Sequence, residues 1–163
     1  MTVTLQVVTL LFVAIAMATM LAHALELPGK LKLSKDEYLA TQRIYYPGFT
    51  IGGGAEPVAL ILLIVLMALT PPGPPFWLTA GAFATLAVAH AIYWVLTHPV
   101  NNFWLKDVEL KGVGGSFFAF DPFSRSSTTD DWTTLRNRWE FSHAVRAVFG
   151  IVSLILVAAA VAA

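Results

Sequence analysis

The sequence predicts an all-α membrane protein, a polytopic up-down four-helix bundle that forms one transmembrane domain over residues 1–163. Hydrophobic residues make up 57% of the chain and charged residues 12%, and the mean hydropathy is +0.71. Soluble domains carry about 25% charged residues. Four apolar stretches approach or exceed the roughly 20 residues that cross a hydrocarbon core about 30 Å thick. The net charge is zero, so no basic field favours nucleic acid, and the absence of cysteine excludes disulfides and thiolate chemistry.

The four spans are expected at about 3–25, 49–70, 76–97 and 139–163. The second apolar run is too short by itself, so the helix must extend back to about Phe49. The proline-rich turn at 71–75 joins the second and third spans, because proline cannot continue a helix. We expect no pair of broken helices of the kind that transporters use.

The distribution of lysine and arginine predicts the orientation. These residues lie between spans one and two, between spans three and four, and at the start of span four, whereas both termini and the proline turn have none. The positive-inside rule then places both long loops in the cytoplasm and both termini outside. The lipid bilayer is the expected environment, and a bacterial inner membrane the expected location.

Both long loops contain helix signals. Ser34 and Glu37 have the spacing of a capping box, which predicts a short helix in the first loop. Tyr38, Gln42 and Tyr45 share one face of that helix, which favours either an interfacial helix with aromatic anchors or a lid over a site. The long second loop is expected to start a helix near residue 130 that continues into span four, after a stretch at 107–127 that could hold a short strand pair.

Helical rise places ionisable residues inside the membrane. Glu56 lies 14 residues before Thr70 and His90 lies 14 residues after Phe76. Both are therefore about 21 Å from the outer edge of their spans. A charge at this depth costs at least about 2.5 kcal/mol, so such residues face the bundle interior and have partners. We expect Glu56 to pair with Arg146 or His90, either in a functional site or as a polar clasp that fixes helix register.

Histidine and carboxylate residues gather at the same end of the bundle. Glu140 and His143 form a Glu-x-x-His pair, and His23 and Glu26 form the reversed pair. Di-iron bundles use the first motif. The candidate metal ligands are His23, Glu26, Glu56, His90, Glu140 and His143. Histidine with carboxylate suits iron or copper, two membrane histidines could hold a haem, and simple capping or hydrogen bonding is the alternative.

Three runs of the sequence carry a family resemblance: residues 23–30 (HALELPGK), 98–101 (HPVN) and 138–146 (RWEFSHAVR). In this order they resemble the anthrone-oxygenase-like family of small four-helix membrane proteins, over most of the chain. Fungal members oxidise polyketide anthrones to anthraquinones with molecular oxygen. The resemblance implies catalytic positions at His98, Asn101, Arg138, His143 and Arg146.

The expected function is a membrane oxidoreductase of oxygenase type that acts on a lipophilic aromatic or quinone-like small molecule. His98 and His143 would act as bases or ligands, with Glu56 or Glu140 as the carboxylate, and Arg146 would stabilise an enolate-like oxygen. The expected substrate-binding residues are Gln42, Tyr45, Trp104, Trp132 and Trp139. The alternatives are a non-catalytic membrane subunit and a haem-binding electron carrier, and a homo-oligomer is left open.

Overall fold

The computed structural model describes residues 3–104, 117, 120 and 131–163, and the description below concerns these residues. Within them every regular element is helical, which confirms the all-α bundle. The elements in chain order are α1 (Val3–Lys30), α2 (Lys35–Gln42), the 3₁₀ turn η1 (Arg43–Tyr45), α3 (Gly48–Gly53), α4 (Ala55–Leu69), α5 (Pro74–Ile92), the π-helical turn η2 (Tyr93–Thr97), α6 (His98–Trp104) and α8 (Trp132–Ala162).

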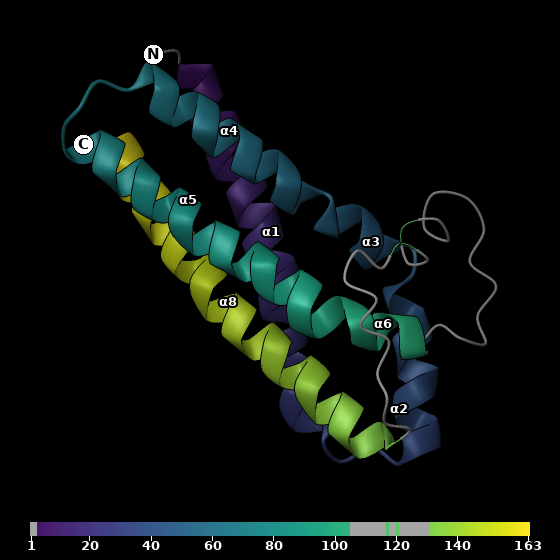
Figure 1. The fold of residues 1–163 in the computed structure, drawn as a ribbon. Coiled ribbons are helices and arrows are strands. Elements are labelled where there is room, and N and C mark those ends of the chain that lie inside the picture. Colours follow the sequence, from purple (N-terminus) through teal and green to yellow (C-terminus); the bar gives the residue numbers. More distant parts are fainter. Residues whose placement is uncertain (1–2, 105–116, 118–119, 121–130) are drawn as a thin grey trace.

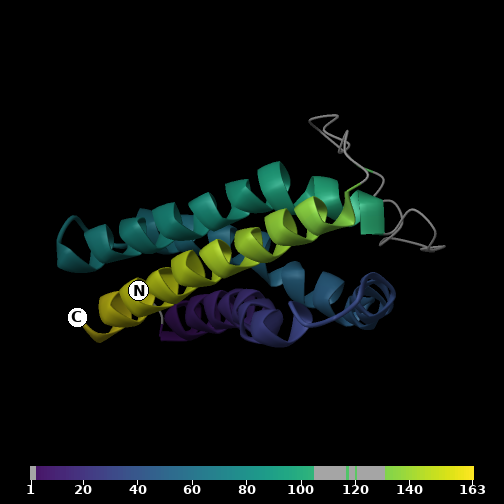
Figure 2. The same cartoon turned by 90° about the horizontal axis from the view of Figure 1, so that it is seen from below.

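Four helical rods are long and apolar enough to cross a membrane: Val3–Lys30, Gly48–Leu69, Pro74–Asn101 and Trp132–Ala162. They pack in the cyclic order α1, α8, α5, α4, and α8 makes the most extensive contacts, with α5 and α1. Both termini lie at the same end as the turn between α4 and α5, whereas α2 and α6 lie at the opposite end (Figure 1). Seen from below, α8 lies between α5 and α1 (Figure 2).

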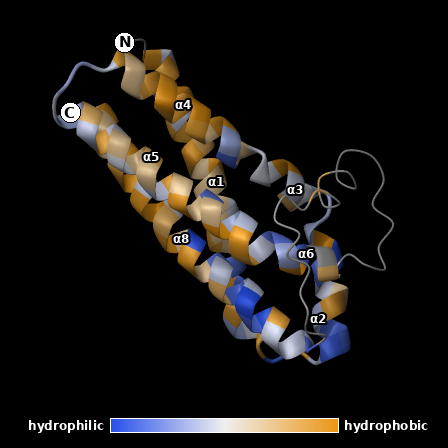
Figure 3. Ribbon diagram, viewed as in Figure 1, coloured by the Kyte–Doolittle hydropathy of each residue, from blue (hydrophilic) through white to orange (hydrophobic). Residues whose placement is uncertain are grey.

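The surface of the rods is apolar, as a lipid environment requires. Large side chains such as Ile61, Trp77 and Ile155 are more than half exposed. Figure 3 shows hydrophobic colours over the half of the bundle that holds the termini and hydrophilic residues concentrated toward the other end. Soluble monomers rarely expose continuous apolar surface on this scale, so these faces fit integral membrane placement.

The predicted local signals largely hold. The capping box is formed in full, because the Ser34 side chain accepts from the Glu37 amide and the Glu37 carboxylate accepts from the Ser34 amide. Asp131 caps α8 through the amides of Thr133 and Thr134, and α8 continues unbroken into the fourth span as expected. Helix α1 continues past its expected end to Lys30, through Pro28. The expected strand pair at 107–127 falls largely outside the described residues.

Two spans are interrupted, contrary to the expectation of unbroken helices. The second breaks at Gly54 between α3 and α4, and the third widens into the π-turn η2. Each irregularity lies about four residues before a proline: Pro57 has no N–H for the carbonyl of Gly53, and Pro99 has none for the carbonyl of Val95. Arg138 supplies the missing donor at Val95, with Nη2 2.7 Å from the carbonyl oxygen. Irregular backbone at membrane depth is tolerated where it lines a cavity or is buried in protein.

The close approach of α1 and α8 depends on Gly150. A Cβ atom at this position would lie 3.3 Å from the Cα of Met17 and 3.2 Å from the Sδ of Met20. We expect Gly150→Val to lower the free energy of unfolding by about 1–3 kcal/mol, because the two helices must separate. Gly29→Val is the matched control, since nothing lies within 4 Å of a Cβ at Gly29. Thermal unfolding in detergent measures both, and equal losses would contradict this packing.

The cap of α2 makes the stability of this helix dependent on pH. Hydrogen bonds from the side chain and backbone of Ser34 lower the pKa of Glu37 below its ordinary value of 4.5. A depressed folded-state pKa gives stability that is complete above 4.5 and is lost as the pH falls through the lowered pKa. We expect amide protection of residues 36–38 to fall over this acidic range in the wild type and to show no such step in Glu37→Gln. Hydrogen exchange corrected for intrinsic rates measures it, and a step that persists in Glu37→Gln would assign it to another group.

Candidate functional site

A cavity of about 370 Å³ opens inside the bundle, toward the end that carries α2. Its walls come from α1, α2, η1, α3, α4, α5, η2 and α8, so all four spans contribute. Both helix irregularities border it, through Gly53 and Gly54 on one side and Tyr93 and Trp94 on the other. The interrupted backbone thus lines the cavity.

The membrane-depth wall of the cavity is an ion pair. Arg146 Nη2 lies 2.7 Å from Glu56 Oε2, and both side chains are almost fully buried. Arg146 also donates from Nε to the carbonyl of Ala89 at 3.2 Å. The break before α4 places Glu56 in the first turn of that helix, where the helix dipole favours a negative charge. The predicted pairing of Glu56 is therefore confirmed.

His90 completes this group, and its hydrogen bond with Trp94 assigns the tautomer. Trp94 Nε1 lies 3.0 Å from His90 Nε2. An indole N–H only donates, so Nε2 must be the accepting, unprotonated nitrogen. The hydrogen of the neutral ring then sits on Nδ1, which lies 3.3 Å from Glu56 Oε1. The group of Glu56, Arg146 and His90 consequently carries one negative and one positive charge.

A buried histidine lies on the α8 wall of the cavity. His143 is 5% exposed, and neither ring nitrogen has a hydrogen-bond partner among the residues that the structure describes. Its ring packs on Trp139 and on His23, with centroid distances of 4.2 Å in both cases. Arg146 follows one helical turn later and therefore shares this face. An imidazole in this position has a free nitrogen for a molecule in the cavity.

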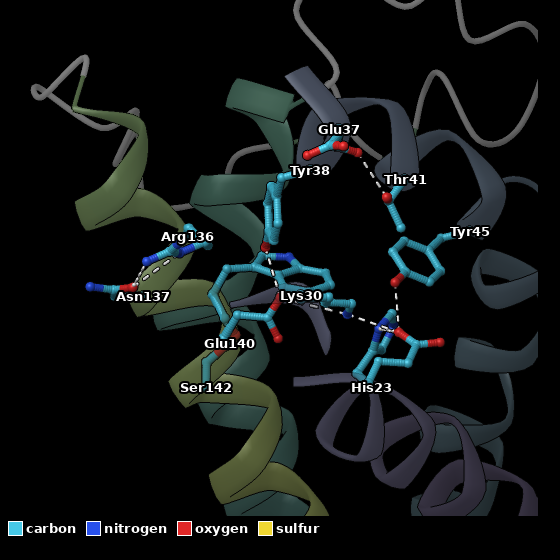
Figure 4. A network of polar contacts seen from close by, with 12 residues as sticks. His23, Lys30, Glu37, Tyr38, Thr41, Tyr45, Arg136, Asn137, Glu140 and Ser142 are labelled. Carbon is cyan, nitrogen blue, oxygen red and sulfur yellow. Dashed lines mark hydrogen bonds and ion pairs between the residues drawn. The ribbon is translucent and has the colours of Figure 1, made fainter. Parts of the chain in front are cut away.

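A charged clamp, formed by Lys30, Glu26, Glu140, Tyr38 and Tyr45, lies at the α2 end of the bundle and reaches the cavity through Tyr45 (Figure 4). Lys30 is buried, with Nζ 2.9 Å from Glu26 and 3.6 Å from Glu140. The hydroxyl of Tyr38 donates to Glu140 at 2.9 Å and that of Tyr45 donates to Glu26 at 2.6 Å. Burial, together with the adjacent carboxylates, raises the pKa of both tyrosines, so they remain neutral donors. The clamp ties α2 and η1 onto α1 and α8.

Only part of the catalytic positions that the resemblance implies line the cavity. His143 and Arg146 line it, whereas His98, Asn101 and Arg138 do not. His98 is fully buried, with Nδ1 3.2 Å from the Tyr93 hydroxyl and Nε2 2.6 Å from the carbonyl oxygen of Phe120. Asn101 accepts from Trp139 Nε1 at 2.7 Å. His98 and Arg138 thus form hydrogen bonds with η2, and Asn101 forms one with Trp139, on the side away from the cavity.

The expected substrate-binding residues also divide. Gln42, Tyr45 and Trp139 line the cavity. Trp104 does not line the cavity and belongs to the apolar cluster beside α2 that also contains Tyr45 and Trp139, and Trp132 packs against that cluster. Helix α2 therefore uses one face for both purposes, with Tyr38 in the apolar cluster and Gln42 at the cavity.

The six expected metal ligands do not converge. Among the described residues no three histidine, aspartate or glutamate side chains lie close enough to hold one ion. Cationic side chains instead neutralise the carboxylates, with Lys30 on Glu26 and Glu140 and Arg146 on Glu56. The rings of His23 and His143 are in direct contact, so this pair does not bracket a haem plane.

Several residues that form the site were not predicted from the sequence. Lys30 counted there only as a loop charge, although it lies four residues after Glu26 and so on the same helix face. Tyr93 contributes the ring over which the Arg146 guanidinium lies at 5.0 Å. Phe49 packs on His23 at 4.6 Å. The i, i+4 spacing could have identified Lys30, whereas the aromatic residues carry no local signal.

Comparisons with protein-family models, curated protein sequences and solved structures gave no match.

Proposed function

We propose that this chain is a membrane-embedded enzyme of oxygenase type, which binds a lipophilic aromatic molecule in the 370 Å³ cavity and removes a proton from it. The observation that carries the proposal is His143, a buried histidine on the cavity wall with both ring nitrogens unpartnered. A polar ring left unpaired in a protein interior is costly, which favours a role in contacting a bound molecule. The aromatic neighbours Trp139, Phe49 and Trp94 suit a flat apolar ligand.

The chemistry follows from the residues around this cavity. His143 would take a proton from an activated methylene beside a carbonyl group, and Arg146 would stabilise the enolate oxygen that forms. The enolate then reduces molecular oxygen to a peroxide bonded at the carbon, the protonated His143 returns its proton to give the hydroperoxide, and loss of water from the hydroperoxide leaves a ketone. For anthrone, the substrate class that the family resemblance suggests, one molecule plus one O₂ gives one anthraquinone plus one water.

The location proposed is a bacterial inner membrane, with both termini outside and both long loops in the cytoplasm. The cavity would then open near the cytoplasmic surface while its charged wall lies at membrane depth. The lysine and arginine distribution supports this orientation.

Two reactions of anthrone test the enzyme proposal. Under argon, deuterium exchange at the anthrone methylene reports proton removal without oxidation, and in air the yield of anthraquinone reports the complete reaction. We expect His143→Gln to lower both rates by about 10²–10⁴-fold. The matched variant His98→Gln should lose less than about tenfold, because His98 lies behind the cavity wall.

Empty membranes supply the uncatalysed rates for both reactions. Wild-type protein that accelerates neither reaction would contradict the proposal, as would His143→Gln with wild-type rates. Retained binding of the aromatic ligand without any turnover would instead favour the non-catalytic binding protein.

A further inference from the structure

We infer that the cavity selects uncharged aromatic molecules with a hydrogen-bonding oxygen, such as phenols and quinones, and rejects aromatic carboxylates, with Glu56 as the residue that determines this selectivity. The inference rests on the proposed function for the location of the ligand and names the substrate class. It concerns only the charge that the cavity accepts.

The charges at the membrane-depth wall of the cavity are balanced. Arg146 alone would attract an anion into a cavity of low polarity, since its charge lies far from water. Glu56 occupies that guanidinium at 2.7 Å and removes the net positive charge. His90 is a neutral ring through the tautomer that Trp94 imposes, so it adds no charge. A bound carboxylate would therefore meet Glu56 without a cation of its own.

Lys30, a second buried cation near the cavity, is also paired with carboxylates, and it does not line the cavity. Lys30 is shared between Glu26 and Glu140 and lies over the rings of Tyr45 and Trp139 at 4.9 and 4.8 Å. Its positive charge is thus balanced within the clamp and is not available to a ligand in the cavity. The remaining polar groups that line the cavity are neutral donors and acceptors, among them Gln42, whose buried Nε2 has no hydrogen-bond partner in the described part of the chain. Such groups bind a hydroxyl or carbonyl oxygen without a charge.

A neutral ligand also suits the proposed reaction. Proton transfer from a neutral molecule to His143 creates one positive and one negative charge inside the cavity, so the total does not change. An anionic ligand would instead bring an uncompensated charge to membrane depth, which is unfavourable in a medium of low polarity.

The test compares two ligands with the same ring system. Tritiated naphthol is neutral and tritiated naphthoate is anionic at neutral pH, and their binding to protein in nanodiscs is measured with empty nanodiscs subtracted for lipid partitioning. We expect wild-type protein to prefer naphthol by at least about tenfold. Glu56→Gln should shift the ratio of the two affinities toward naphthoate by at least about tenfold, since Arg146 then lacks its carboxylate.

Two further variants keep the test decisive. Glu56→Gln/Arg146→Gln restores a neutral wall and should return the preference to naphthol, even if the single variant folds poorly. Glu37→Gln makes the same chemical change outside the cavity, at the α2 cap, and should keep the wild-type ratio. A wild-type preference for naphthoate, or an unchanged ratio in Glu56→Gln, would overturn the inference.

This outcome is separable from that of the proposed enzyme. Charge selectivity that shifts as expected without any turnover would sink the enzyme and leave the inference standing. Turnover that depends on His143 with no shift in ligand preference would sink the inference alone.

Discussion

Arg146→Met is expected to lower the free energy of unfolding by about 3–5 kcal/mol, because it leaves the buried Glu56 carboxylate without its cation. His90 remains 3.3 Å from Glu56, but among the described residues it is the only other ionisable partner of that carboxylate. Unfolding by denaturant in detergent micelles measures the loss.

Two variants separate the ion pair from packing. The double variant Glu56→Leu/Arg146→Met should recover most of the lost stability, because an apolar pair of similar volume often replaces a buried salt bridge without cost. Arg136→Met should change stability by less than about 1 kcal/mol, since Arg136 lies at the surface over the ring of Trp132 at 5.1 Å. A double variant as unstable as the sum of the single variants would contradict this account of the pair.

Lys30→Met is expected to cost a similar amount, about 3–5 kcal/mol, and to release α2 from the bundle. The substitution leaves the buried Glu140 and the partly exposed Glu26 without the ammonium group that joins them. The two carboxylates then repel each other. Their displacement weakens the hydrogen bonds from Tyr38 and Tyr45, whose hydroxyls donate to these carboxylates and hold α2 and η1 in place.

The result to measure is amide hydrogen exchange of residues 35–45 beside overall stability. We expect Lys30→Met to accelerate exchange of residues 35–45 more than exchange of α8, because the clamp provides the main polar contacts that hold this segment on the bundle. Lys32→Met, which removes an exposed lysine two residues away, should stay within about 0.5 kcal/mol of wild type. Unchanged exchange at 35–45 in Lys30→Met would mean that the apolar cluster alone anchors α2.

Helical rise alone was enough to predict the wall at membrane depth. Counting residues from the span edges put Glu56 and His90 at one level, and the structure brings them to 3.3 Å with Arg146 on the other carboxylate oxygen. Capping and periodicity likewise identified the buried face of α2 and η1, where Tyr38, Gln42 and Tyr45 are all less than 6% exposed. These features depend on local spacing, which a sequence displays directly.

The placement of His98 and Asn101 required information that spacing does not contain. A π-turn adds one residue to the helix and so rotates everything after it by about 100°. Residues beyond η2 therefore leave the face that a regular helix would present to the cavity. Pro57 and Pro99 were the available signals for both interruptions, because each removes the donor for a carbonyl four residues earlier.

The metal hypothesis was based on sequence spacing, which does not reveal the partners of a side chain. An i, i+3 spacing shows that two side chains share a face, and it does not show which partner they meet. In the folded chain Glu26 and Glu140 meet Lys30, and Glu56 meets Arg146. The partners of a buried carboxylate are set by the packing of distant helices, so the choice between a cation and a metal ion was not local.

Photolabelling with a diazirine derivative of naphthol, in the presence and absence of excess naphthol, tests the existence of the binding cavity most directly. We predict labelling that naphthol competes away on cavity residues such as Phe49, Trp94 and Trp139, and labelling without competition on lipid-facing residues such as Phe141 and Val148. Labelling confined to the lipid-facing residues, or equally insensitive to competition at all five positions, would contradict a cavity that takes an aromatic ligand.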